Sequence, residues 1–318
     1  MKASICCISY NHGKFIGQSL NSFLSQKTDF AYEIIISDDS SNDDTGRVIE
    51  EFMSANPGRI TLFKNDVNIG MAKNFEKAIR ACKGEYIALC EGDDFWCNDD
   101  KLQKQVDFLS ANKDFAICFH NARILKDHVP NEVGFSNSES QKEVSTFSDL
   151  ALGEFIYTPT CMFRRKDFEK FSPRYAKYLN NYTLDLHNAQ FGKIKYFNEV
   201  MSVYRIHPGG VWSMVRREQT LINQLPAYKF YLKYFDEKYK KYFIRHLKMM
   251  TEELISLKIS NNDYKDFWRF YKDYIIYNMA NKNEIKKAIS IFVKANYYII
   301  KAKLQNSEGG KSLPSTRN

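Results

Sequence analysis

The first 120 residues alternate short apolar runs with segments of helical periodicity, and this alternation restricts the chain to few folds. The apolar runs are residues 4–9, 33–37, 60–64, 85–90 and 115–119. Several are apolar on both faces, which is typical of strands in a parallel sheet that is covered on both sides. A β-α-β-α order with right-handed crossovers predicts an α/β protein with a doubly wound, mostly parallel sheet and helices on both faces. In such sheets, ligands bind beyond the carboxyl ends of the strands.

The pattern changes after residue 120. Residues 127–146 are polar and include Pro130 and Gly134, so we expect a loop there, with the character of a lid. From about residue 215 apolar residues recur at helical spacing throughout; one such stripe contains Leu221 and Leu225, and a later one contains Ile285, Ile289 and Phe292. We therefore expect a helical appendage over residues 215–305 and a disordered tail over residues 306–318.

Composition and charge exclude some classes of protein. A hydrophobic fraction of 44% excludes wholesale disorder, and no apolar stretch approaches the roughly 18 residues that a membrane span needs. The N-terminus turns polar too soon for a signal peptide. The seven cysteines form no CxxC pair, which indicates reduced thiols in a cytosolic protein. Residues 216–305 hold 19 Lys/Arg against 9 Asp/Glu, whereas residues 1–215 hold 25 against 28, so the C-terminal segment suits an anionic partner.

Acidic residues gather directly after two of the expected strands. The second strand leads into the segment DDSSNDDT, residues 38–45, which is either a solvated loop that caps a helix or a set of acceptors for a base N–H or a ribose hydroxyl. The fourth strand leads into Glu91-Gly92-Asp93-Asp94. These three carboxylates repel one another, and no nearby residue in the sequence neutralises them. A divalent cation such as Mg²⁺ or Mn²⁺, sharing phosphate oxygens, would resolve the repulsion; a solvated acidic turn is the alternative.

Taken together, these motifs resemble those of the family 2 glycosyltransferases with the GT-A fold. The resemblance covers about residues 1–215 and rests on the order of Tyr10-Asn11, then DDSSNDDT, then the NxGxxxN segment that ends at Asn74, then the acidic turn followed by Trp96. It extends to residues 192–194 (GKI) and 204–213 (YRIHPGGVWS). The latter segment is similar to the end of the catalytic domain in bacterial members that build surface polysaccharides.

The resemblance implies a donor site. Tyr10 and Asp39, with Asp38 beside them, match residues that hold the nucleobase, and Asn74 closes the nucleotide-side motif. Glu91 and Asp93 match the metal-binding carboxylates, although Glu91 replaces the usual Asp. His207 lies where members often place a His near the diphosphate, so Asp93, Glu91 and His207 are the expected metal residues. A loop His without a ligand is the alternative for His207.

The catalytic base is less directly implied. The family places an Asp near the start of a helix that leads into the Gly-Lys-Ile turn, and that position falls near Asn181, which cannot act as a base. Asp185 lies four residues later on the same helical face and is the only carboxylate between Glu169 and Glu199. We therefore expect Asp185 to be the base, with His187 or Asp94 as substitutes.

The resemblance thus implies an inverting, Mn²⁺- or Mg²⁺-dependent glycosyltransferase. Residues 1–214 would form the catalytic domain, with a nucleotide half over about residues 1–120 and an acceptor half over about residues 121–214. The donor would be a nucleoside-diphosphate sugar, with UDP favoured, and the acceptor a saccharide or lipid-linked saccharide. The protein would be cytoplasmic, and its basic segment would contact the anionic inner face of the plasma membrane. An exposed aromatic helical face could pair two chains.

Three alternatives stay open at the level of sequence. A sugar-nucleotide nucleotidyltransferase has a similar sheet, but its glycine-rich start with a following Arg and Lys is missing after the first strand. A non-catalytic nucleic-acid- or membrane-binding protein would use the basic helices, although their interleaved apolar stripes favour a packed appendage, and no nucleic acid is expected. A catalytically inactive family member is the third alternative.

Overall fold

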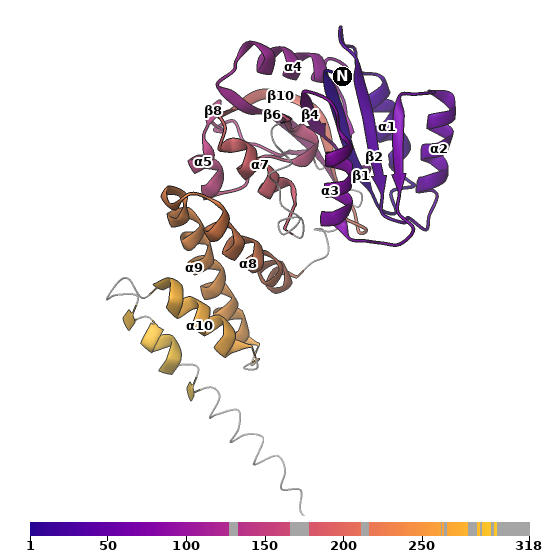
Figure 1. Cartoon of the computed structure of the whole chain (residues 1–318). Helices are drawn as coiled ribbons and strands as arrows, with labels where there is room; N and C mark the ends of the chain where they lie inside the picture. Colours follow the sequence, from indigo (N-terminus) through magenta and orange to yellow (C-terminus); the bar gives the residue numbers. More distant parts are fainter. Residues whose placement is uncertain are drawn as a thin grey trace, which may run out of the picture. The chain divides into compact units, whose positions relative to one another are not determined.

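A computed structural model describes residues 1–126, 133–165, 178–210, 216–261, 263, 266–278, 285–286, 288–293 and 296–297 (Figure 1). By its internal contacts the chain divides into two compact units, residues 1–214 and 215–318. None of the helices in these described ranges is long and apolar enough to cross a membrane. The functions assigned to the two units from sequence stay predictions, and the tail 306–318 lies outside the described residues.

The first half of the sheet consists of four parallel strands in the order β3-β2-β1-β4. The strands are β1 (Ala3–Ser9), β2 (Tyr32–Asp38), β3 (Ile60–Lys64) and β4 (Tyr86–Leu89), joined by α1 (Ile16–Leu24), α2 (Thr45–Ala55) and α3 (Met71–Ala81). The chain steps outward from β1 to β3 and then returns to β4, so right-handed crossovers place α1 and α2 on one face and α3 on the other (Figure 1). The point of reversal lies between β1 and β4, where α/β sheets bind ligands.

The second half of the sheet is mixed and continues in the order β9-β6-β10-β5. It consists of β5 (Phe95–Trp96), β6 (Phe115–Lys126), β9 (Met162–Arg164) and β10 (Lys193–Ile206), with the helices α4 (Lys101–Ala111), α5 (Phe147–Leu152), η1 (Thr158–Thr160) and α7 (Asn181–Ala189). The expected loop over 127–146 is wrong in part, because β7 (Val133–Phe135) pairs with β6 and β8 (Val144–Ser145) pairs with β10. Residues 127–132 lie outside the described residues.

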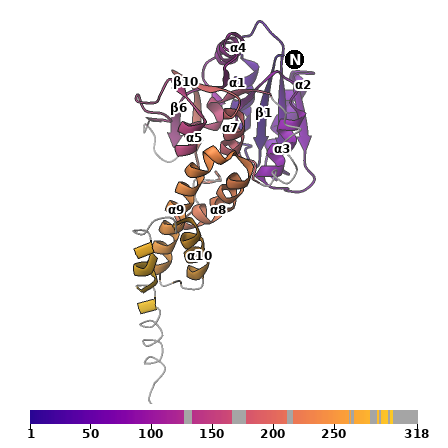
Figure 2. The same cartoon turned by 60° about the vertical axis from the view of Figure 1, so that its left-hand side comes forward.

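The C-terminal unit is helical, as expected. Helices α8 (Arg217–Tyr234), α9 (Glu237–Ser260) and α10 (Phe267–Asn278) lie side by side (Figure 2). Leu221 and Leu225 of α8 pack with Leu247 and Leu254 of α9, so these predicted stripes are confirmed as core. The stripe of Ile285, Ile289 and Phe292 is not buried: these side chains are 39%, 57% and 44% exposed, and Ala288 faces the core instead.

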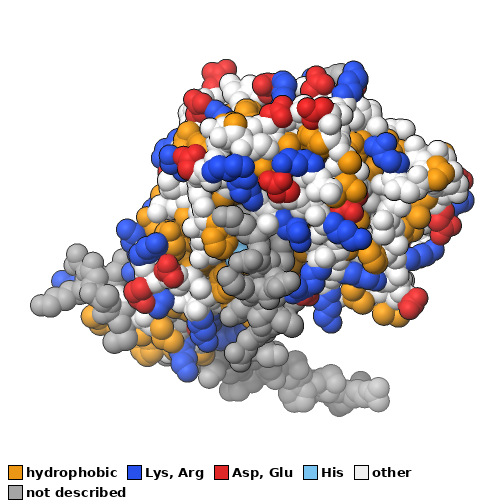
Figure 3. Space-filling model, turned by 45° about the horizontal axis from the view of Figure 1, so that its top comes forward, with side chains coloured by type: hydrophobic (Ala, Val, Ile, Leu, Met, Phe, Trp, Pro, Cys, Tyr) orange, Lys and Arg blue, Asp and Glu red, His pale blue; other side chains and the backbone are white. Residues whose placement is uncertain are grey.

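Acidic and basic side chains are interspersed over the face of the molecule that Figure 3 shows. Beneath the surface, one cation is fully buried. Lys101 at the start of α4 is 0% exposed, donates from Nζ to Oε1 of Gln105 at 2.7 Å, and lies 4.0 Å from the centre of the Trp96 ring. Burial lowers the pKa of Lys101 to about 8, and the opposing influence of the neighbouring thiols of Cys90, Cys118 and Cys161 is too weak to cancel it.

This burial predicts a pH-dependent stability. Below pH 8 Lys101 is protonated in both the folded and the unfolded chain; between pH 8 and about 10.5 the unfolded chain binds the extra proton. The unfolding free energy of the wild type should therefore rise with pH through this window, by at most about 3 kcal/mol, relative to that of Lys101→Met. Urea unfolding of both proteins from pH 7.5 to 10.5 measures the difference. Parallel stability curves would show that Lys101 keeps an ordinary pKa.

Candidate active site

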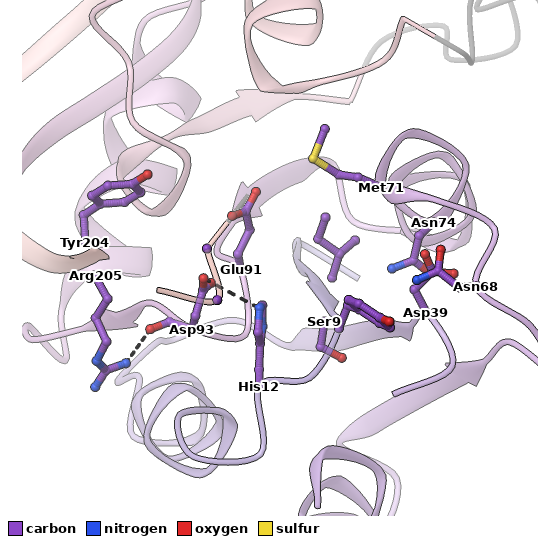
Figure 4. A pocket seen from close by; sticks show the side chains of 14 residues that line it. Ser9, His12, Asp39, Asn68, Met71, Asn74, Glu91, Asp93, Tyr204 and Arg205 are labelled. Atoms are coloured by element: carbon purple, nitrogen blue, oxygen red, sulfur yellow. Dashed lines mark hydrogen bonds and ion pairs between the residues drawn. The ribbon is translucent and has the colours of Figure 1, made fainter. Parts of the chain in front are cut away.

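A cavity opens at the carboxyl ends of β1, β2 and β4 (Figure 4). Its empty volume is about 850 Å³, including open solvent. The residues that line it come from the segments after these strands, from α3 and from β10 and the turn that follows: Ile8, Ser9, Tyr10, His12, Asp39, Asn68, Met71, Asn74, Glu91, Asp93, Tyr204, Arg205, Gly209 and Gly210. The structure thus brings together five of the predicted site residues, namely Tyr10, Asp39, Asn74, Glu91 and Asp93.

Asp39 organises one side of the cavity, where Figure 4 shows it with Asn68 and Asn74. Its Oδ1 accepts hydrogen bonds from the backbone N–H of Ile69 at 2.8 Å and from Asn65, and its Oδ2 accepts one from the N–H of Gly70 at 2.9 Å. Gly70 has φ 87°, a backbone conformation that glycine adopts without strain. Asp39 therefore fixes the turn that leads into α3. Each of its oxygens has two lone pairs, so Oδ2 can accept one more hydrogen bond.

Asp38 takes a different position from its neighbour. It is 0% exposed and does not line the cavity. Its Oδ1 accepts from the hydroxyls of Ser9 at 2.9 Å and Ser41 at 2.5 Å, and its Oδ2 accepts from the N–H of Ser41 at 3.1 Å. Asp38 therefore ties the end of β1 to the loop after β2. Its predicted contact with a nucleotide stays a prediction, and these contacts support a positioning role.

Asp94 joins the acidic turn to β10. It is 1% exposed, and its Oδ1 accepts from the backbone N–H of Arg205 at 2.8 Å. Burial, then the charges of Asp93 and Glu91, raise the pKa of Asp94 well above its usual range. The guanidinium of Arg205 donates to the backbone carbonyl of Asp93 in the same turn, and also to the side chain of Gln18 on α1.

Asp93 lies between two imidazoles. Its Oδ2 is 3.1 Å from Nε2 of His207 and 3.6 Å from Nε2 of His12 (Figure 4), whereas its Oδ1 is buried and has no hydrogen-bond partner among the described residues. Burial alone would raise the pKa of Asp93, but the hydrogen bond from His207 and the charge of His12 outweigh it, so the pKa is lowered. Burial is also the main reason that the pKa of His12 is lowered.

Glu91 stands between the two sides of the cavity in Figure 4. Burial, then the charge of Asp93, raise its pKa to about 7, against a weak hydrogen bond from Nδ2 of Asn181 to Oε1 at 3.5 Å. A carboxyl group with this pKa is about half protonated near neutral pH in the absence of a cation.

The donor set fits a divalent cation. Three carboxylates line the cavity (Asp39, Glu91 and Asp93), against the single guanidinium of Arg205, so a diphosphate alone would be repelled. The buried, unpartnered Oδ1 of Asp93 is a hard oxygen ligand of the kind that Mg²⁺ and Mn²⁺ prefer. No cluster of three or more His, Cys, Asp or Glu side chains in the described part of the chain forms a ready-made metal cage. The residues therefore suit a cation that shares its coordination with substrate oxygens.

Asp185 does not line the cavity. It lies on α7, is 1% exposed, and its Oδ1 accepts from the thiol of Cys161 at 3.4 Å. Burial is the main reason that the pKa of Asp185 is raised well above its usual range. Asn181, one turn earlier on α7, is the residue that reaches the acidic turn, through Glu91, and it also contacts Thr158. The assignment of the base to Asp185 stays a prediction.

Sequence reasoning missed several residues that line the cavity. His12 directly follows the Tyr10-Asn11 pair, but no family position marks it. Tyr204 and Arg205 precede His207 in the YRIH segment, and only the His was selected. Asn68 begins the NxGxxxN segment but was not selected as a site residue, and Met71 follows the glycine of that segment, where its residue type gives no chemical signal.

Comparison with known proteins shows the family of the chain. The family described as Glycosyl transferase family 2 matches residues 4–172. An uncharacterized protein of Mycobacterium tuberculosis is 35% identical over 209 residues, which is 66% of this chain but only 60% of that protein's length. WfaP of Escherichia coli, a UDP-Glc:α-D-GlcNAc-diphosphoundecaprenol β-1,3-glucosyltransferase, is 31% identical over 210 residues, covering 65% of this chain and 78% of WfaP.

Solved structures share the fold at low sequence identity. Residues 1–349 of S. aureus TarS, in complex with UDP-GlcNAc, superpose with a TM-score of 0.68 at 17% identity, covering 96% of this chain and 92% of that TarS chain. The mannosyltransferase PcManGT of Pyrobaculum calidifontis, in complex with GDP-Man and Mn²⁺, gives a TM-score of 0.51 at 16% identity, covering 93% and 87%. The predicted GT-A fold with C-terminal helices is confirmed. On the family match, the chain belongs to glycosyltransferase family 2.

Proposed function

We propose that the chain is an inverting glycosyltransferase that takes a sugar from a nucleoside-diphosphate sugar, with UDP favoured. Its acceptor would be a saccharide or lipid-linked saccharide in bacterial surface polysaccharide synthesis. The observation that carries the proposal is Asp93, a buried carboxylate with one unpartnered oxygen, in the same cavity as Tyr10 and Asp39. The UDP-GlcNAc complex of TarS and the UDP-glucose chemistry of WfaP support a uridine nucleotide.

The residues divide the proposed donor site into two parts. The exposed ring of Tyr10 and the free capacity of Asp39 Oδ2 suit the base, which offers a flat face and an N–H. Asp93 would hold the cation, with Glu91 and His207 beside it. When bound, Mn²⁺ or Mg²⁺ supplies positive charge that offsets the negative charge of the departing nucleoside diphosphate. The clamp of Asp94 and Arg205 holds the backbone of the acidic turn so that Asp93 keeps its direction.

Loss of one carboxylate tests this arrangement. We expect micromolar UDP binding by the wild type with Mn²⁺, little binding with EDTA, and at least a tenfold loss of metal-dependent binding in Asp93→Asn, because the Oδ1 ligand then carries no charge. Isothermal titration calorimetry measures all three. Asp44→Asn, whose side chain is 70% exposed on the loop before α2, is a control of equal charge change. Failure of the wild type to bind UDP, dTDP and GDP alike would contradict the proposal.

The proposed base is Asp185, which would remove the proton from the acceptor hydroxyl as it attacks the anomeric carbon. Because Asp185 is buried beside Cys161, an acceptor could reach it only after a rearrangement near the N-terminal turn of α7. Glu91 lines the cavity and Asn181 contacts it, and these two residues define the competing arrangement.

Two substitutions on α7 separate these arrangements. If Asp185 is the base, Asp185→Asn should lower kcat by about 10²–10⁴-fold and leave UDP binding unchanged, and adding Asn181→Asp should not restore turnover. Steady-state transfer assays and calorimetry measure the two effects, and circular dichroism confirms folding. Unchanged turnover in Asp185→Asn would contradict the assignment, and recovery of turnover in the double variant would show that a carboxylate at position 181 can serve the acceptor.

We also propose that the helical unit contacts an anionic membrane surface at the cytoplasmic face. Trp268, Lys272 and Ile276 share one face of α10, and the Trp268 ring lies 5.7 Å from that of Phe292. Trp268, Ile276 and Phe292 are 43%, 58% and 44% exposed. Exposed aromatic and aliphatic side chains with lysines between them are typical of helices that lie in a membrane interface, and the +10 charge of residues 216–305 suits anionic headgroups.

Vesicle sedimentation tests this contact. We expect binding to phosphatidylserine-containing vesicles that falls with added salt, and a several-fold weaker binding for Trp268→Glu with Phe292→Glu, because a charge replaces apolar area that would be buried in the interface. Met249→Glu, at a side chain of α9 that is 57% exposed, is the matched control. A wild type that ignores anionic vesicles contradicts the proposal, and a dimer in analytical ultracentrifugation that the double variant disrupts would assign the face to a second copy of the chain.

A further inference from the structure

His12 is the one imidazole among the residues that line the cavity, and the family resemblance assigns it no role. It follows β1 directly, and its backbone carbonyl accepts from the N–H groups of Phe15 and Ile16, both at 2.8 Å, at the start of α1. The backbone is therefore fixed on both sides of the residue, and its side chain, 14% exposed, is held at the cavity wall next to Asp93.

The packing of the ring indicates where its proton lies. Nδ1 is buried and has no hydrogen-bond partner among the described residues. It lies against Gly92, where a Cβ would stand only 3.0 Å away, so no side chain or water separates the two. An N–H buried without an acceptor costs more than a bare nitrogen in the same place, since an N–H has a strong donor to satisfy. The proton therefore belongs on Nε2.

Among the described residues, Nε2 of His12 also has no acceptor within hydrogen-bonding distance. Its distance to Oδ2 of Asp93 is 3.6 Å, which is too long for an N–H···O hydrogen bond, whereas Nε2 of His207 lies 3.1 Å from the same oxygen. Among the described residues that line the cavity, Arg205 alone carries a permanent positive charge, and its guanidinium donates to Gln18 and the carbonyl of Asp93. His12 is thus a fixed donor beside the carboxylate that would hold the cation.

We propose that Nε2–H of His12 donates a hydrogen bond to a diphosphate oxygen of the nucleotide donor. The inference rests on the proposed function and adds a ligand-binding residue to its site. His12 contacts the phosphates as a donor and does not ligate the cation, because ligation through Nε2 would require the proton on the unpartnered Nδ1. Asp93, with His207 hydrogen-bonded to its Oδ2, would serve the cation, while His12 would serve the anion.

Calorimetric titration of the full chain with UDP and Mn²⁺ tests the proposal. His12→Ala should weaken UDP binding by about tenfold or more, because a hydrogen bond to a charged oxygen is lost. His12→Gln, whose amide nitrogen can take the place of Nε2, should recover most of the affinity, whereas His12→Asn, which mimics Nδ1, should not. Uridine lacks the phosphates, so its weaker binding should be the same in all four proteins.

Mn²⁺ titration without nucleotide, followed by electron paramagnetic resonance, separates the donor role from ligation. The affinity for the metal alone should be the same in His12→Ala and the wild type. A loss of that affinity in His12→Ala would overturn the inference in favour of a metal ligand. Equal UDP affinity in the wild type and His12→Ala would overturn it outright while leaving the proposed function intact. A wild type that binds no nucleoside diphosphate would overturn both.

Discussion

The hydrogen bond from the backbone of Arg205 to the carboxylate of Asp94 ties the turn after β4 to β10, and the cavity between these elements depends on it. Strand β4 ends one residue before the acidic turn, and β10 belongs to the far half of the sheet. Asp94 receives the N–H of β10, and the Arg205 side chain returns to the carbonyl of Asp93. A carboxyl group that is 1% exposed is stable there only because it is paired in this way or protonated. The three neighbouring acidic residues consequently have three separate roles: Asp94 anchors the turn to β10, Asp93 faces the cavity, and Glu91 contacts Asn181 of α7.

The sequence predicted the parallel half of the sheet well, because apolar runs that are buried on both faces have few other solutions. β1, β2, β3 and β4 lie within one residue or so of the predicted segments. The mixed half was largely missed. β10 is 14 residues long, but it mixes charged with apolar residues, and its pairing with β6 is interrupted by register shifts. A strand whose alternation is broken by bulges does not show a period of two in the sequence.

The site was predictable to the extent that strand ends determine it. Residues that directly follow β1, β2 and β4 must meet at one edge, so Tyr10, Asp39 and Asp93 could be placed together from sequence. Their separate roles could not. Asp38 and Asp39 are adjacent and chemically identical, yet one is enclosed by serine hydroxyls and the other lines the cavity, because successive side chains of an extended segment point to opposite sides. His12 and Arg205 were missed for a similar reason: their importance comes from contacts with Asp93, which is distant in the chain.

The contact between Asp94 and Arg205 joins residues 111 positions apart, and it therefore determines when the cavity can exist during synthesis. The strands β1 to β4 and their helices are local enough in sequence to form as soon as about 100 residues are free, but the wall made by Tyr204 and Arg205 arrives only after about another hundred have been added. Closing so long a loop is entropically costly and slow compared with local pairing. During synthesis there is therefore a period in which the acidic turn is present but lacks its contacts with Arg205 of β10. The order of residues along the chain thus makes the cavity one of the last features of the first unit to be completed.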